Sequence, residues 1–140
     1  MKRAILFAVV GLLFLGAGLA AYAQPSQYVV NVPFPFFVGE HQLPAGVYYV
    51  DSKRPFDSSP MTIEILHSGN DAGIALQTAA TLESKDKAPA AKLVFHQYGT
   101  AYFLTQFWGS DGRGKQLAET SRETELARKQ SPTDLSIAAR

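Results

Sequence analysis

The stretch Lys92–Trp108, KLVFHQYGTAYFLTQFW, decides the fold of this chain. Aromatic and branched side chains, which favour strands, fill both of its halves, and Gly99-Thr100 lies between them. A glycine at the first position of a two-residue turn suits the type II′ geometry of β-hairpins. We therefore expect an antiparallel hairpin in which Phe95 pairs with Leu104.

Other strand-like runs flank this hairpin and are separated by turn signals. They are Gln27–Val32, Phe36–Val38, Val47–Asp51, Met61–His67, Gly73–Thr78 and Gln116–Thr120. Short strands at such spacing predict an all-β domain, either an antiparallel β-sandwich or a small β-barrel of about seven or eight strands. Pro33 and Pro35 cannot donate hydrogen bonds to a strand ladder, so we expect a bend or an edge there.

The end of the chain departs from this pattern. Residues 121–130, SRETELARKQ, are good helix formers, and Thr120 or Ser121 can cap a helix that begins there. Pro132 would stop it. The sequence thus predicts a short C-terminal α-helix over residues 121–130 and a loose tail over residues 131–140.

The beginning of the chain has the three parts of a secretory signal. Lys2-Arg3 is followed by an uncharged run over residues 4–20 and then by Ala21-Tyr22-Ala23, with small residues at the two positions that a signal peptidase recognises. Cleavage after Ala23 would make Gln24 the first residue of a single β-rich domain over residues 24–130. We expect export to the periplasm or the medium, with the signal helix outside the domain. The alternative is that the run stays as a membrane anchor.

Composition excludes several classes of function. The chain has no cysteine, so disulfides, thiolate nucleophiles and thiolate metal sites are excluded. Without Lys2 and Arg3, 11 basic residues remain against 12 acidic ones, which gives no electrostatic footprint for nucleic acid. We expect no cofactor, and no stable membrane span once the leader is removed.

One segment has the spacing of a phosphate-binding loop. Gly109–Lys115 matches G-x-x-x-x-G-K, but Gln116 stands where the loop needs a serine or threonine hydroxyl for magnesium. We interpret the segment as a glycine-rich hairpin loop.

The histidines and carboxylates show no spacing typical of a catalytic or metal site. An enzyme of the hydrolase type would need two of five groups to meet in a cleft. These groups are His41, His67, His96, Glu64 and Asp51. We expect His96 to be a partly buried strand residue, and the carboxylates Glu119, Glu123 and Glu125 to form a solvated helix face.

The aromatic residues are the most unusual feature. Neighbours in a strand point to opposite faces, so one of Tyr48 and Tyr49, and one of Tyr102 and Phe103, must leave the main core. A second sheet and the C-terminal helix can cover such residues. If they are not covered, the candidate ligand or partner surface comprises Tyr49, Tyr102, Phe107 and Trp108.

Four motifs carry a resemblance to a known group of proteins. They are VNVPFPFFVG (residues 30–39), LPAGVYYV (43–50), LVFHQYG (93–99) and SRETELA (121–127). On these motifs the chain resembles a group of small exported bacterial proteins that have a signal peptide and one all-β domain. The resemblance implies export and an all-β fold, and no catalytic residue.

Three functions remain open from the sequence. The first is a non-enzymatic binding or structural module of the cell envelope or extracellular space, with an envelope protein, a glycan or an apolar molecule as its partner. The second is a carrier of a small lipid-like ligand in a sandwich or barrel pocket. The third is a hydrolase that uses histidine and carboxylate groups.

Overall fold

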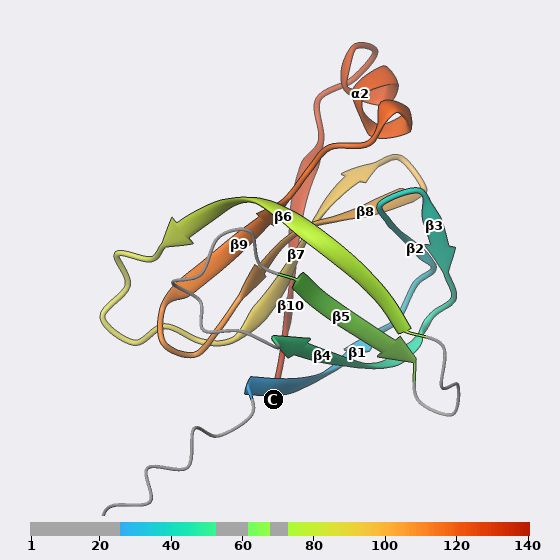
Figure 1. Ribbon diagram of the computed structural model, residues 1–140. Helices are drawn as coiled ribbons and strands as arrows, with labels where there is room; N and C mark the ends of the chain where they lie inside the picture. Colours follow the sequence, from blue (N-terminus) through green and yellow to red (C-terminus); the bar gives the residue numbers. More distant parts are fainter. Residues whose placement is uncertain (1–25, 53–61, 68–72) are drawn as a thin grey trace, which may run out of the picture.

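The protein is an all-β domain with one short helix (Figure 1). The structure, a computed structural model, describes residues 26–52, 62–67 and 73–140. The predicted signal peptide, including Ala21, Ala23 and Gln24, lies outside these residues. In the described part the strands are β1 (Ser26–Val32), β2 (Phe36–Val38), β3 (His41–Leu43), β4 (Gly46–Ser52), β5 (Thr62–His67), β6 (Gly73–Glu83), β7 (Lys92–Tyr98), β8 (Ala101–Trp108), β9 (Arg113–Leu117) and β10 (Thr133–Ala138), and the helix is α2 (Ser121–Ala127).

Two sheets share the long strand β6. Its residues 73–77 pair with β5 in the sheet β1-β4-β5-β6, and residues 78–83 pair with β9 in the second sheet. The second sheet continues from β9 through β8 and β7 to β10, and the hairpin β2–β3 adds to β8 beside β9.

The two sheets also meet at the chain end. The backbone groups of Val29 in β1 and Arg140 exchange hydrogen bonds of 2.8 and 3.0 Å. Figure 1 shows the end of the chain beside β1. The architecture is therefore a β-sandwich, one of the two predicted arrangements, and its sheets are joined at both sides as the strands of a barrel are.

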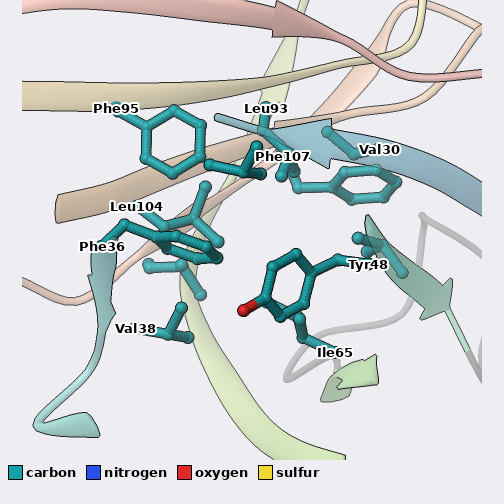
Figure 2. Close-up of a cluster of buried hydrophobic side chains, with 12 residues drawn as sticks. Val30, Phe36, Val38, Tyr48, Ile65, Leu93, Phe95, Leu104 and Phe107 are labelled. Carbon is teal, nitrogen blue, oxygen red and sulfur yellow. The ribbon is translucent and has the colours of Figure 1, made fainter. Parts of the chain in front are cut away.

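Aromatic rings fill the space between the sheets (Figure 2). The ring of Phe36 meets those of Tyr48 and Phe95 edge to face, at centroid distances of 5.1 and 5.3 Å. Phe107 and Tyr28 make a similar contact at 5.4 Å. Such pairs stabilise a core by about 0.5–1.5 kcal/mol beyond the burial of their area.

Tyr48 brings a polar group into this interior. Its hydroxyl donates a hydrogen bond to the carbonyl oxygen of Pro44, which compensates for part of the lost hydration. Burial raises the pKa of the Tyr48 hydroxyl above its ordinary value.

The proline pair forms the predicted bend, and the structure shows that this bend carries the chain from one sheet to the other. β1 ends at Val32 in the first sheet and β2 begins at Phe36 in the second. Between the prolines, Phe34 stacks on Tyr102 at 3.9 Å and meets Phe95 edge to face. The bend thus delivers an aromatic side chain to the core.

The central hairpin has the predicted register. Tyr98 lies opposite Ala101 and Phe95 opposite Leu104. Gly99 has a φ of 60° and Thr100 does not have a positive φ, as a type II′ turn requires. The register shifts once, between Val94 and Phe95.

Several predicted boundaries were wrong. Residues 131–140 are not a loose tail, because β10 pairs with β7 along its whole length. The last predicted strand, Gln116–Thr120, begins three residues earlier, at Arg113. His41–Leu43 forms the short strand β3, which is not among the strands predicted from the sequence. Local propensity does not mark the true bounds of these segments, because pairing with other strands decides them.

The predicted helix is present but shorter. α2 ends at Ala127 and not at residue 130. The N–H groups of Lys129 and Gln130 both reach the carbonyl of Leu126, which tightens the last turn. The chain must then turn back, because Pro132 disfavours helix at the preceding residue and β10 begins directly after it.

Gly114 provides a test of this packing. A Cβ added there would lie 2.7 Å from two carbons of the Trp108 ring, opposite it on β8. We expect Gly114→Ala to lower the free energy of unfolding by about 1–3 kcal/mol, as overpacking does, and to shift the emission of the chain's one tryptophan.

The matched control is Gly99→Ala. Its added Cβ meets nothing within 4 Å, but its φ is positive. Because of the backbone strain at this φ, Gly99→Ala should lower the free energy of unfolding by about 1–2 kcal/mol, and it should leave the tryptophan emission unchanged. Equal emission spectra for both variants would contradict the close contact.

Candidate functional site

The candidate site lies near one end of the second sheet, where α2 stands above β2, β3 and β8 (Figure 1). Phe37 of β2 and Phe103 of β8 are register partners, and their rings stack at 5.0 Å with an angle of 18°. Their sequence neighbours Phe36 and Leu104 belong to the core, so alternation directs these two rings outward. They make an aromatic floor outside the barrel.

The floor is partly covered. Phe103 is only 2% exposed and meets the ring of Tyr98 edge to face at 5.8 Å. Phe37 is half-buried, and the guanidinium of Arg122 in α2 lies 4.9 Å from its ring centroid. Cover by the C-terminal helix is one of the two arrangements that the sequence allowed.

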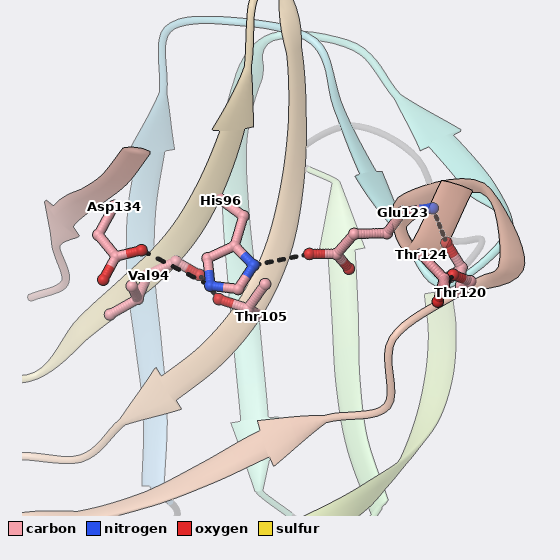
Figure 3. A network of polar contacts seen from close by, with 7 residues as sticks. All are labelled: Val94, His96, Thr105, Thr120, Glu123, Thr124 and Asp134. Atoms are coloured by element: carbon pink, nitrogen blue, oxygen red, sulfur yellow. Dashed lines mark hydrogen bonds and ion pairs between the residues drawn. The ribbon is translucent and has the colours of Figure 1, made fainter. Parts of the chain in front are cut away.

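The start of α2 is defined by a threonine cap. The Thr120 hydroxyl oxygen accepts a hydrogen bond from the backbone N–H of Glu123, and the Thr124 hydroxyl donates to the Thr120 carbonyl. In a capping box the Glu123 carboxylate would return to the backbone of the cap. Here it points away from the helix, toward the sheet (Figure 3).

Glu123 connects α2 to β7. Its carboxylate oxygen lies 2.7 Å from Nδ1 of His96, and the Glu123 side chain is only 3% exposed. Nε2 of the same ring lies 3.6 Å from a carboxylate oxygen of Asp134 in β10. His96 therefore bridges the helix and the last strand (Figure 3). We call His96, Glu123 and Asp134 the histidine bridge.

Tyr98 completes the surroundings of Glu123. Burial raises the pKa of the Tyr98 hydroxyl, and the negative charges of Glu123 and Glu119, a hydrogen bond to Glu123 and the charge of Asp134 raise it further. Tyr98 therefore stays protonated at neutral pH and donates to the buried carboxylate. Two side chains of β7 thus contact the buried carboxyl group of the helix.

A groove of about 360 Å³ opens between α2 and the aromatic floor. Phe37, Ala101 and Phe103 line one side, and Arg122, Glu125, Leu126 and Lys129 line the other. The lining is mostly apolar, with cations at both ends of the helical side. A volume of this size lies at the lower end of those that hold small ligands or side-chain anchors.

The other side of α2 carries a polar hollow. Its volume is about 430 Å³, and its lining comprises Glu119, Ser121, Thr124, Glu125 and Arg128. It has no aromatic floor to desolvate a ligand. We therefore regard the apolar groove as the candidate site, and the polar hollow as a source of control positions.

The aromatic surface predicted from the sequence does not exist as one surface. Phe107 is 1% exposed and belongs to the core, so its assignment to a surface was wrong; alternation points it inward. Tyr102 is half-buried against the core and stacked on Phe34. Tyr49 lies half-buried in the first sheet, on β4.

Trp108 is the member that faces outward on the second sheet. Its indole lies against Gly114, Nε1 donates to the Gln106 side chain, and the Lys92 amine lies 5.8 Å from the ring centroid. It lies on the half of β8 that pairs with β9, whereas Phe103 lies on the half that pairs with β2. Trp108 therefore is not part of the groove lining.

The five groups weighed for a hydrolase lie on four strands: His41 on β3, Asp51 on β4, Glu64 and His67 on β5, and His96 on β7. His41 is exposed on β3, and Asp51 lies opposite Glu64 in the register of β4 and β5. His96 instead meets Glu123 and Asp134. Sequence reasoning placed Glu123 on a solvated helix face and Asp134 in a tail, so it missed the histidine bridge; the T-x-x-E cap over residues 120–123 was the one available signal.

The glycine-rich segment is a hairpin loop, as interpreted from the sequence. The turn at residues 109–112 joins β8 to β9, with a hydrogen bond from Gly109 N–H to the Arg113 carbonyl. Lys115, the lysine of the phosphate-loop spacing, is fully buried, and its amine donates to the Thr81 hydroxyl at 2.6 Å. It is thus directed to the protein interior.

The described residues hold neither a group of metal ligands nor a membrane-spanning helix. Within residues 26–52, 62–67 and 73–140, no three histidine, cysteine, aspartate or glutamate side chains are grouped so that they could hold a metal ion. No helix in the same part of the chain has the length and apolar character needed to cross a membrane.

Comparison with known proteins gave no relative. No family model matches the chain, and neither a curated protein nor a solved structure matches it.

The contact between His96 and Glu123 predicts a specific dependence of stability. We expect Glu123→Gln to lower the free energy of unfolding by about 1–3 kcal/mol, because a buried hydrogen-bonded group loses its charge-assisted partner. Glu125→Gln, on the exposed side of the same helix, should change it by less than about 0.5 kcal/mol.

Urea unfolding of His96→Gln, Glu123→Gln and the double variant measures the coupling. The two single effects should be non-additive by about 0.5–3 kcal/mol. Additive effects would show that the contact does not hold α2 to the sheet.

Proposed function

We propose that this protein is an exported, non-enzymatic binding module whose partner docks in the apolar groove beside α2. The observation that carries the proposal is the aromatic floor of Phe37 and Phe103, which has an open groove beside it on the outside of the barrel. Anchors that bury apolar side chains in such recesses contribute most of the binding energy in protein interfaces. The sheet forms the rigid floor of the groove, and the helix forms its wall.

The alternative of a lipid-like ligand inside the barrel has less support. Phe36, Tyr48, Phe95 and Phe107 contact other rings across the interior. A ligand there would have to displace packed rings, and interiors are packed at high density. The outer groove needs no such displacement.

The alternative of a hydrolase also has less support. The histidine–carboxylate pair that the fold does bring together, His96 and Glu123, lies beneath α2. Glu123 is fully engaged in holding the helix to the sheet. The pair supports the wall of the groove, and a structural role accounts for its contacts.

Export is the part of the proposal that rests on the leader. Lys2-Arg3, the uncharged run over residues 4–20 and Ala21-Tyr22-Ala23 support it, as does the resemblance to small exported bacterial proteins. We expect the protein isolated from its own cells to begin at Gln24, which intact-mass measurement of the envelope and medium fractions would test. A full-length mass in a membrane fraction would contradict cleavage and favour a retained anchor.

Site-specific photo-crosslinking in the native cells tests the groove. A photoreactive residue at Lys129, which lines the groove, should give a discrete crosslinked product, because the partner covers this position. The same residue at Arg128, which lines the polar hollow, is the matched control and should not.

Leu126→Asp should abolish the product at position 129, since a charge in the apolar lining must be desolvated on binding. Equal products from both positions, or a product that persists with Leu126→Asp, would overturn the proposed site.

A further inference from the structure

The charges around the groove are arranged along one line. Arg122 and Lys129 are seven residues apart on α2 and its last turn, which corresponds to about 10 Å along a helix axis. Leu126 lies between them, facing the aromatic floor across the groove. The groove therefore has a cation at each end and apolar surface in the middle.

The lining has one acidic residue, Glu125, and it does not cancel the two positive charges of the groove. Glu125 lies 3.9 Å from the Lys129 amine, and both side chains are about 70% exposed. Such exposed pairs contribute little, because water screens them. The Lys129 amine has three N–H donors, so it can donate a hydrogen bond to a carboxylate of a ligand as well as to Glu125.

A ligand with a single anionic group would use only one of the two cations. An extended peptide with two acidic side chains can pair with both cations. Its side chains at alternate positions share one face, so an apolar residue can enter the groove while the residues two before and two after it point the same way. Those two residues are separated by about 13 Å, within reach of the long Arg122 and Lys129 side chains.

On the basis of this charge complementarity, we propose that the occupant of the groove is an extended acidic segment of a partner protein, with the pattern acid-x-apolar-x-acid. The inference rests on the proposed function of the groove and adds the chemistry of its partner. The apolar side chain contacts Phe37, Phe103 and Leu126. The two carboxylates pair with Arg122 and Lys129.

Three labelled peptides test the pattern by fluorescence anisotropy against the processed protein. The first has the core Glu-Ser-Phe-Ser-Glu, the second Lys-Ser-Phe-Ser-Lys, and the third Glu-Ser-Ser-Ser-Glu. We expect the first to bind at least tenfold more tightly than the other two. Its affinity should fall with added salt, because exposed ion pairs are screened.

Charge reversal in the protein tests which of its residues recognise the charges of the peptide. Arg122→Glu combined with Lys129→Glu should reverse the preference, so that the lysine-ended peptide binds better than the glutamate-ended one. Arg128→Glu changes a residue of the polar hollow and should leave the preference intact. Circular dichroism shows that each variant keeps its sheet.

The outcomes separate this inference from the proposed function. If the two phenylalanine peptides bind equally and Leu126→Ser abolishes both, the groove binds partners but the acidic pattern is wrong. If vesicles of phosphatidylglycerol bind through Arg122 and Lys129 while all peptides fail, the acidic-peptide inference is overturned in favour of a lipid surface. If the peptides fail and the crosslink at Lys129 is also absent, both proposals fail.

Discussion

The structure depends on one constraint: each strand of a closed sheet presents every second side chain to the interior and the others to the outside. Inside, the rings of Phe36, Tyr48, Phe95 and Phe107 meet edge to face and occupy the space between the sheets. The chain has more aromatic residues than this interior takes. The remaining ones must be covered in another way or stay open to a partner.

α2 partly covers these outward-facing rings. Its Arg122 lies over the ring of Phe37, and the buried carboxylate of Glu123 attaches the helix to the sheet. Burial of a carboxylate is costly unless it has hydrogen-bond partners, and His96 and Tyr98 lie in position to be those partners. The contact of Glu123 with His96 places α2 beside β7. Beside the helix lies the apolar groove, whose lining includes Arg122 and Lys129.

The closure of the barrel and the position of the helix are coupled through the last strand. β10 begins after Pro132, pairs with β7 and ends beside β1 (Figure 1). Asp134, near its start, approaches the same His96 that holds Glu123. A segment that looks like a polar tail therefore closes the sheet and flanks the support of the site.

The sequence by itself determined the all-β class, the central hairpin with its register and the proline bend, because strand propensity, turn chemistry and alternation act over a few residues. It also determined that some aromatic residues must face outward. Only the tertiary structure decided which of them stay accessible, why Phe107 is core, and how Glu123 meets His96, 27 residues away. These depend on which distant strands become neighbours and what covers each face, and the energy of such contacts exists only after the chain has folded.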